Sequence, residues 1–496
     1  MRDHLVFYVN ATRHTVRGDE AGLTLSDFLR QGRSGQRLCG TKIACAEGDC
    51  GACTVLVGTP DGDGKRFVYR TIDACIAFVY QLDCKHIVTV EGLASEGQLN
   101  AAQQAMVDCH GSQCGFCTPG FVMALQGLVE EQEDGKPLSD DQLRLGLSGN
   151  LCRCTGYSQI LDAGHAIDPA KAGRAAATYD TQTMLAEFAE IVRDTVHVNA
   201  PADVQTNGHP RPPQVEALLP KTLAELLEQR AKRPDAKLVS GATDVGVQFN
   251  HGKIDPASVI VTHGVEELRR MEVVDGVLES GAAVTWDRLE EFSRDALPEY
   301  YDILTRFGSP QVRHAGTLVG NLANASPIAD SIPFHFVAES TIELASTRGA
   351  RSVPIDKFYK GYKQLDLADD EVITGVRTPL PTDSVQVKLY KVSKRRDMDI
   401  STATLAFWLE LDGDLITTAR IAAGGVGPTV IRLPRAEETL TGEPLTLELM
   451  QEAGRLSRDE FTPLSDVRGS DAFRWQLIEN LFAKCWHDVA GTAAVA

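Results

Sequence analysis

The amino-acid sequence predicts a multidomain α+β protein. Its 496 residues are enough for three or four domains with cores of their own. Short segments with the alternation of half-buried strands are mixed along the chain with amphipathic helical segments. Eight of the twelve cysteines form two groups in the first third of the chain, as metal ligands do, which fits a reducing compartment better than a disulfide framework.

Composition and charge exclude several classes of function. The formal net charge of −19 argues against a nucleic-acid-binding protein, because phosphate binding needs clustered Lys and Arg. No apolar run approaches the length of a transmembrane helix, and the N-terminal MRDHLVFYVN lacks a secretory apolar region. We therefore expect a cytoplasmic protein with no membrane partner.

The N-terminal region predicts a small sheet with one helix. Residues 5–9 alternate as a strand does, and after a turn residues 15–16 return as the second strand of a hairpin. A short helix is expected at 26–30, and further strands at 54–57 and 67–69. Residues 1–91 are therefore interpreted as a ferredoxin-like domain.

The first cysteine group lies in this domain and consists of Cys45, Cys50, Cys53 and Cys75. C-x4-C-x2-C with a distant fourth Cys is the plant-type ferredoxin spacing for a [2Fe–2S] cluster. Three thiolates must reach one small core from a single loop, and Gly48 and Gly51 allow the loop to wrap by taking φ > 0. Zinc is the alternative, but zinc loops favour paired C-x2-C knuckles.

The second cysteine group consists of Cys114, Cys117, Cys152 and Cys154. Its C-x2-C…C-x-C spacing, taken alone, leaves zinc open. Thr118 and Pro119 predict an N-cap followed by Pro at the first helical position, and Ser139 with Gln142 predicts a capping box. We therefore expect a helical domain at 92–168, with the two cysteine pairs at facing helix ends where N–H groups stabilise a negatively charged cluster.

Four cysteines belong to neither group: Cys39, Cys84, Cys109 and Cys485. We interpret them as small buried apolar side chains. Because Cys39 lies close before the first loop, a swapped ligand stays an alternative.

The remainder of the chain predicts a linker and two further α+β regions. Residues 169–213 are expected to be a linker that holds one helix at 183–192 and ends in a Pro-rich stretch. A helix is expected at 223–230. Near the C-terminus, strands at 403–411 and 416–423 precede helices at 447–456 and 472–486.

Two glycine-bearing segments in this part of the chain are candidate binding loops. Residues 240–246 follow a strand end and enter a helix, an arrangement that can cradle phosphate through backbone N–H groups. It matches neither a Walker loop nor G-x-G-x-x-G. Residues 308–330 form a long polar loop between apolar segments, and long loops of this composition are more often functional than structural.

Three stretches carry a family resemblance: GTKIACAEGDCGACTV, QCGFCTPGFVMAL and GNLCRCTGY. They closely resemble the iron–sulfur domains of the molybdenum hydroxylases, the xanthine dehydrogenase and aldehyde oxidase family. The resemblance implies that both cysteine groups ligate [2Fe–2S] clusters, the second in a four-helix-type domain. All eight ligand positions of the family are cysteines in this sequence.

The two candidate loops resemble the FAD-binding domain of the same family, whose α+β fold is shared with vanillyl-alcohol oxidase. The resemblance implies an FAD-binding domain at 214–383 and a C-terminal α+β flavoprotein domain at 384–496. Val319-Gly320-Asn321 departs from the usual Gly-Gly-Asn, and Val319 would be strained if that position needed φ > 0. The implied FAD-binding residues are Leu238, Val239, Ser240, Gly241, Ala242, Thr243, Asp244, Val245, Thr317, Asn321, Ser326, Asp330, Ile373 and Lys391.

The resemblance implies an electron-transfer subunit, similar to the small subunit of a split, bacterial-type xanthine dehydrogenase. Electrons would pass from a molybdopterin-bearing large subunit through the helical-domain cluster and the plant-type cluster to FAD and then NAD+. No residue of this chain need act as a catalyst in hypoxanthine or xanthine hydroxylation. A heterotetramer of two small and two large chains is expected.

Three alternatives to this function stay open. The chain could serve a molybdenum hydroxylase for an aldehyde or another N-heterocycle, and for any of these substrates the choice between NAD+ and oxygen as acceptor stays open. It could instead be a stand-alone NADH-dependent flavin and iron–sulfur reductase, or a zinc-stabilised interaction protein.

Overall fold

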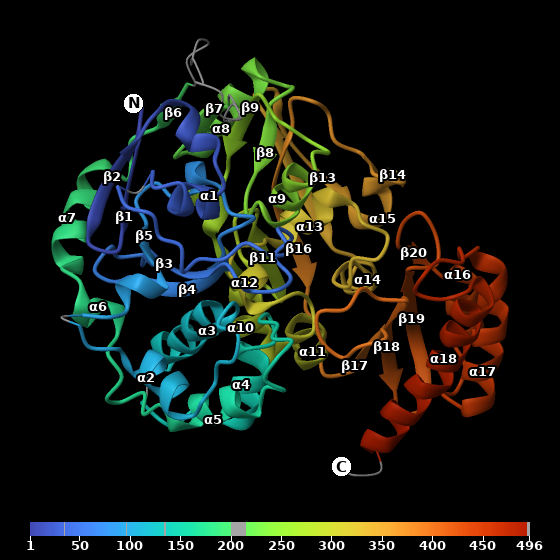
Figure 1. Ribbon diagram of the computed structural model, residues 1–496. Helices are drawn as coiled ribbons and strands as arrows, with labels where there is room; N and C mark the ends of the chain where they lie inside the picture. Colours follow the sequence, from blue (N-terminus) through green and yellow to red (C-terminus); the bar gives the residue numbers. More distant parts are fainter. Residues whose placement is uncertain (34, 96, 133–134, 200–214, 494–496) are drawn as a thin grey trace. The chain divides into compact units, whose positions relative to one another are not determined.

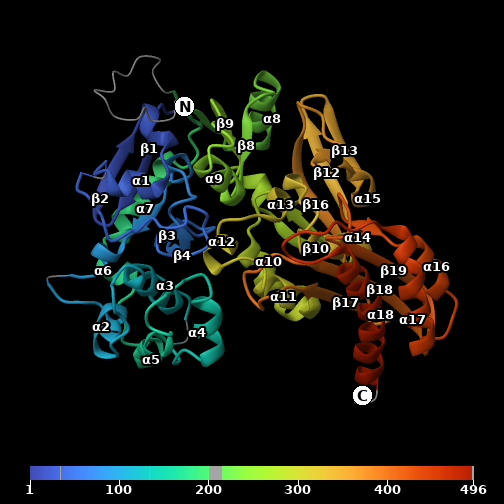
Figure 2. The same ribbon diagram turned by 45° about the vertical axis from the view of Figure 1, so that its right-hand side comes forward.

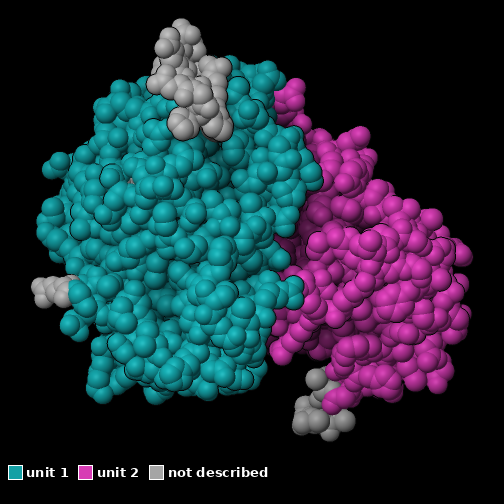
Figure 3. Space-filling model, viewed as in Figure 1, with its two compact units in different colours: residues 1–266, 309–316 teal, residues 267–308, 317–496 magenta. Residues whose placement is uncertain are grey.

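The structure is a computed structural model that describes residues 1–33, 35–95, 97–132, 135–199 and 215–493. It divides into two compact units, one of residues 1–266 with 309–316 and the other of residues 267–308 with 317–496 (Figure 3). Both units mix helices with sheets, which confirms the multidomain α+β class (Figures 1 and 2). No helix among the described residues is long and apolar enough to cross a membrane.

The first unit begins with the predicted ferredoxin-like sheet, in the order β2-β1-β5-β3-β4. Its strands are β1 (Leu5–Val9), β2 (Thr12–Val16), β3 (Thr54–Pro60), β4 (Phe67–Asp73) and β5 (His86–Val88). Helix α1 (Leu25–Arg30) begins where the Thr24 side chain accepts a hydrogen bond from the Asp27 N–H. The Phe28 ring of this helix packs edge-on against Phe7 of β1, so the helix covers the sheet as expected for a β-grasp fold.

A four-helix domain follows, as the sequence predicts. Its helices are α2 (Ala101–Asp108), α3 (Thr118–Glu131), α4 (Asp140–Gly146) and α5 (Ser158–Ala166). The capping box of Ser139 and Gln142 is confirmed at the start of α4. The predicted N-cap at Thr118 is wrong, because Thr118 is already helical, Cys117 is the N-cap and Pro119 lies one position further in.

Part of the expected linker is built into the first unit. It contains α6 (Ala175–Thr178), α7 (Thr181–Ile191) and β6 (Val196–Val198). Helix α7 buries Met184, Leu185 and Phe188 in the same apolar cluster as α3. Residues 200–214 of the expected linker lie outside the described residues.

A second sheet completes the first unit in the order β6-β7-β9-β8. Its other strands are β7 (Glu216–Leu219), β8 (Lys237–Val239) and β9 (Ser258–Val261), which run parallel to one another. The helices here are α8 (Leu223–Lys232), α9 (Thr243–Asn250) and the short α12 (Pro310–Arg313). Helix α9 follows β8 directly, so the glycine-bearing loop lies at the carboxyl end of a parallel strand.

The second unit holds two antiparallel sheets. The first has the order β10-β11-β16-β12-β13, and the second has the order β17-β18-β19-β20. The first sheet contains β10 (Met271–Val274), β11 (Val277–Gly281), β12 (Thr341–Ser346), β13 (Gly349–Pro354) and β16 (Val372–Pro379). Around it lie α10 (Trp286–Ala296), α11 (Pro298–Thr305), α13 (Leu318–Asn324), α14 (Ile332–Val337), α15 (Ile355–Phe358) and the hairpin β14 (Tyr359–Gly361) with β15 (Gln364–Leu365).

The C-terminal region contains the predicted strands at 403–411 and 416–423 and the predicted helices at 447–456 and 472–486, as parts of β18, β19, α17 and α18. Its strands are β17 (Val385–Val392), β18 (Ala403–Asp412), β19 (Leu415–Gly424) and β20 (Ile431–Arg432), and its helices are α16 (Pro434–Leu440), α17 (Leu447–Leu456) and α18 (Asp471–Ala493). Phe407 of β18 packs edge-on against Phe482 of α18, with ring centroids 5.0 Å apart. Helix α18 is longer than the predicted 472–486.

Candidate iron–sulfur and flavin sites

The first cysteine group gathers in the loop between α1 and β3, with Cys75 following β4. Cys45 forms side-chain hydrogen bonds with Cys50 and Cys75, and Cys75 forms another with Cys53. Cys53 and Cys75 are buried, whereas Cys45 and Cys50 are half-buried. The loop wraps as predicted, because Gly48 and Gly51 have φ of 72° and 64°.

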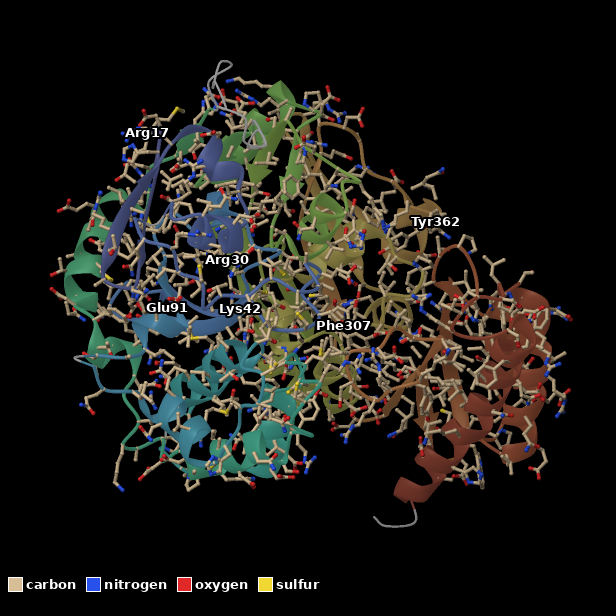
Figure 4. All side chains as sticks on the ribbon, in the orientation of Figure 1. Arg17, Arg30, Lys42, Glu91, Phe307 and Tyr362 are labelled. Atoms are coloured by element: carbon tan, nitrogen blue, oxygen red, sulfur yellow. The ribbon has the colours of Figure 1, made fainter. Side chains whose placement is uncertain are left out.

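Cations and backbone groups surround this loop. Arg30 donates to the carbonyl oxygens of Cys39 and Thr41, and Lys42 donates to that of Cys39 (both cations are labelled in Figure 4). Hydrogen bonds with the Cys50 and Cys75 thiols lower the pKa of Cys45, and its sulfur also accepts from the Glu47 N–H at 3.4 Å. The setting therefore favours a thiolate at Cys45, whereas the pKa values of the Cys50, Cys53 and Cys75 thiols are raised.

Sequence reasoning missed a buried carboxyl beside the first group. Asp73, at the end of β4, accepts a hydrogen bond from the Cys53 thiol at 3.4 Å. Burial raises the pKa of Asp73 to about 7. The position two residues before Cys75 was visible in the sequence, but its burial was not.

The second cysteine group forms two pairs across the helical domain. Cys117, the N-cap of α3, contacts Cys152, and Cys114 contacts Cys154, both through side-chain hydrogen bonds. Cys152 and Cys154 lie in the loop before α5 rather than at its first turn. Burial opposes ionisation of Cys152, but hydrogen bonds from the Thr155 hydroxyl, at 3.2 Å, and the Cys154 N–H give it a lowered pKa.

The gathering of four thiols fits a binuclear cluster in both domains. No group of three or more His, Cys, Asp or Glu side chains that could hold a metal ion is found among the described residues. A [2Fe–2S] core needs two thiolates at each of two irons rather than four around one ion. The first group joins its four thiols in a chain, Cys50 to Cys45 to Cys75 to Cys53, and the second group forms two pairs, so each supplies the four sulfur donors of such a core.

The ungrouped cysteines were predicted to be buried, and the prediction is confirmed for two of them. Cys84 and Cys485 are buried. Cys39 and Cys109 are half-buried, so the prediction is wrong for these two. Cys109 is the C-cap of α2, where the helix ends.

In the first unit, the predicted flavin loop joins β8 to α9. Leu238 and Val239 belong to β8, the next three residues form the turn, and α9 begins at Thr243. The turn is held by a hydrogen bond from Gln81 to the Ser240 carbonyl oxygen at 3.0 Å. The first N–H groups of a helix have no intrahelical partner, so this end of α9 suits a diphosphate.

Gly241 is required in this turn by a close backbone approach. A Cβ at Gly241 would lie 2.0 Å from the Ala315 carbonyl oxygen.

Gly241→Ala is therefore expected to displace the turn and weaken FAD binding about tenfold or more, since overpacking costs on the order of 1–3 kcal/mol. The measurement is flavin retained per chain after dialysis. Gly264→Ala, where a Cβ meets only ordinary contacts, is the control, and equal flavin retention in both variants would contradict the prediction.

The second unit holds the other predicted flavin residues. The segment 308–330 is not a loop throughout, because it contains the short helices α12 and α13. Helix α12 begins at Pro310, and Thr317 is the N-cap of α13. The Thr317 hydroxyl oxygen accepts from the Gly320 N–H, and Asn321 accepts from the Ser331 hydroxyl at 2.8 Å. Val319 is helical and is not among the residues with positive φ, so its side chain introduces no backbone strain.

Two of these residues form a buried ion pair. The Lys391 ammonium lies 2.6 Å from Asp330, and both side chains are less than one-tenth exposed. Lys391 also donates to the Arg306 carbonyl oxygen at 3.1 Å, and the Ser401 hydroxyl donates to Asp330. Sequence reasoning missed Ser401, for which no local signal exists. Ser326 follows α13, and Ile373 is buried in β16.

Comparison with known proteins decides the family. Residues 89–165 match the [2Fe-2S] binding domain, residues 213–381 the FAD binding domain in molybdopterin dehydrogenase, and residues 388–489 the CO dehydrogenase flavoprotein C-terminal domain. The chain is 31% identical to xanthine dehydrogenase of Emericella nidulans over 98% of its own length. The chain belongs to the molybdenum hydroxylase family.

The chain matches only part of the length of its curated relatives, and the solved structure matches only part of this chain. The chain spans only 39% of the Emericella nidulans protein, and it is 29% identical to xanthine dehydrogenase 1 of Arabidopsis thaliana over 97% of this chain and 39% of that one. Among solved structures, a chain of quinoline 2-oxidoreductase from Pseudomonas putida 86 is similar with a TM-score of 0.52 at 27% identity. It covers 55% of this chain and 96% of its own length.

Proposed function

We propose that the chain is the electron-transfer part of a molybdenum hydroxylase of the xanthine dehydrogenase type. Electrons released when hypoxanthine or xanthine is oxidised to urate would enter this chain at the helical domain. They would leave it from the flavin side to NAD+. The observation that carries the proposal is that each cysteine group brings its four thiols into contact, as a chain in the first group and as two pairs in the second.

The residues of this chain would bind and tune the redox groups. The clusters, when bound, would supply one-electron carriage, and FAD would supply exchange of electron pairs with NAD+. Cys45, Cys50, Cys53 and Cys75 would hold the plant-type cluster, and Cys114, Cys117, Cys152 and Cys154 the other. The turn at Gly241 would bind the FAD diphosphate through backbone N–H groups. Asn321, Asp330 and Lys391 would lie around the flavin side.

The exposure of the thiols supports the proposed order of the two clusters. Cys114 and Cys154 are exposed, whereas Cys53 and Cys75 are buried. A cluster held at an exposed edge is the one that a partner's redox group can approach, because electron transfer needs proximity. The proposed partner is a large subunit that binds the molybdenum cofactor, in a heterotetramer of two small and two large chains.

The substrate class has one supported alternative. The similarity to xanthine dehydrogenases favours purines and NAD+. The structural similarity to quinoline 2-oxidoreductase favours another aromatic N-heterocycle as the second candidate. Turnover of xanthine and of quinoline by the purified complex, each with NAD+ and with oxygen, distinguishes these possibilities.

Elemental analysis tests the proposal directly. Protein purified together with whatever accompanies it is expected to hold about four iron, about four acid-labile sulfide and about one FAD per chain. Molybdenum is expected on a second polypeptide. The same cofactors without molybdenum or a partner would support a stand-alone reductase instead. Zinc in place of iron would overturn the electron-transfer function.

A further inference from the structure

One buried amide lies where the two cysteine-bearing loops meet. Gln311, in α12, belongs to the stretch that matches the FAD-binding domain, yet it packs within the first unit and is 1% exposed. Its Nε2 donates to Asn150 Oδ1 at 2.9 Å and to Thr54 Oγ1 at 3.1 Å. Thr54 follows Cys53 of the first group, and Asn150 lies two residues before Cys152 of the second. A single side chain therefore binds both loops.

The two loops are also in direct contact with each other. The Leu151 N–H donates to the Cys50 carbonyl oxygen at 3.0 Å, so one hydrogen bond joins a cysteine of the first group to the residue before Cys152. The Gly51 carbonyl oxygen accepts from Asn150 Nδ2 at 3.1 Å and from the Thr54 hydroxyl at 2.7 Å. A Cβ at Gly51 would lie 2.3 Å from the Gly149 carbonyl oxygen, so the backbones touch.

The segment that carries Gln311 is anchored at further points. His314 Nδ1 lies 2.8 Å from the Thr71 carbonyl oxygen, and its Nε2 lies 3.5 Å from Glu131 at the end of α3. The next residue, Ala315, supplies the carbonyl oxygen that packs against Gly241 of the flavin loop. Residues 309–316 thus run from the junction of the two cysteine-bearing loops to the flavin loop.

We propose that Gln311 is a positioning residue that sets the spacing between the two iron–sulfur clusters. The inference rests on the proposed function, because it requires both clusters to be bound. A buried amide that loses a hydrogen-bond acceptor carries a desolvation cost. The two loops are therefore held where Gln311 Nε2 can donate to both Asn150 and Thr54. Without this amide, the loops would be held by fewer bonds, and their separation would relax.

The test is a pair of matched substitutions, Gln311→Met and Gln126→Met. Gln126 is also 1% exposed and also donates two hydrogen bonds, to Glu130 and to the Gly173 carbonyl oxygen, but it lies in α3 away from the junction. Both variants lose a buried amide of the same size, so both are expected to unfold at lower temperature. A merely structural role would make them equivalent in every other measurement.

The discriminating measurement is the paramagnetic resonance spectrum of the dithionite-reduced holoprotein. The magnetic interaction between two reduced clusters falls steeply with their separation. Gln311→Met is expected to keep iron and FAD but lose the splitting caused by this interaction, whereas Gln126→Met is expected to keep the splitting. An unchanged splitting in Gln311→Met would overturn the inference.

If Gln311→Met fails to incorporate iron, Thr54→Val replaces it, because valine keeps the shape of threonine and removes one acceptor of the amide. Full iron with reduced splitting in Thr54→Val supports the inference, and full iron with unchanged splitting overturns it. Parent protein without iron overturns the proposed function itself, which separates the two failures.

Discussion

Cys114→Ser is expected to abolish electron flow from substrate to NAD+ while FAD stays bound. Cys114 lies at the exposed edge of the helical domain and pairs with Cys154, so its loss leaves one iron without a thiolate pair. Iron is expected to fall from about four to about two per chain. The flavin residues lie elsewhere in the chain, and reduction of FAD by NADH is therefore expected to continue.

Cys109→Ser provides the matched control for this substitution. Cys109 is a half-buried cysteine of the same domain that belongs to neither group. Iron, flavin and turnover are expected to match the parent protein. Loss of FAD from Cys114→Ser with both clusters intact would contradict the assignment of Cys114 as a ligand.

Lys391→Met is expected to destabilise the protein by about 3–5 kcal/mol, since it leaves the buried Asp330 carboxylate without its cation. The Ser401 hydroxyl cannot replace the lost positive charge of Lys391, and solvent cannot do so because the Asp330 side chain is less than one-tenth exposed. The measurement is chemical denaturation of the FAD-loaded protein. FAD affinity is expected to fall with the same substitution, because the predicted flavin residues Asp330 and Lys391 would lose their fixed geometry.

Lys232→Met is the control for an exposed lysine in an ion pair. Lys232 pairs with Glu228 one helical turn away, and both side chains are more than half exposed. Such pairs contribute about 0–1 kcal/mol, so the free energy of unfolding is expected to change little. Equal stability of the two variants would show that the buried pair at Lys391 is not needed by the fold.

Local features were predictable because their causes are local. The capping box at Ser139, helix α17 and the cysteine spacing of the first loop depend on residues a few positions apart. Two predictions about local structure were wrong. Thr118 was expected to be the N-cap of α3, but Cys117 occupies that position without a side-chain capping bond, and the Thr118 hydroxyl donates to Ser112. The loop at 308–330 contains α12 and α13, which are too short for periodicity to reveal.

The sequence by itself predicted the chemistry, because the spacing of Cys45, Cys50 and Cys53 is that of a plant-type cluster. The family resemblance assigned the second cysteine group and the flavin residues. Only the tertiary structure decided which groups meet. Gln311 reaches Asn150 and Thr54 across 161 and 257 positions of the chain, and Lys391 reaches Asp330 across 61. Contacts at such separations follow from how whole sheets and helices pack, and no local pattern of residues encodes them.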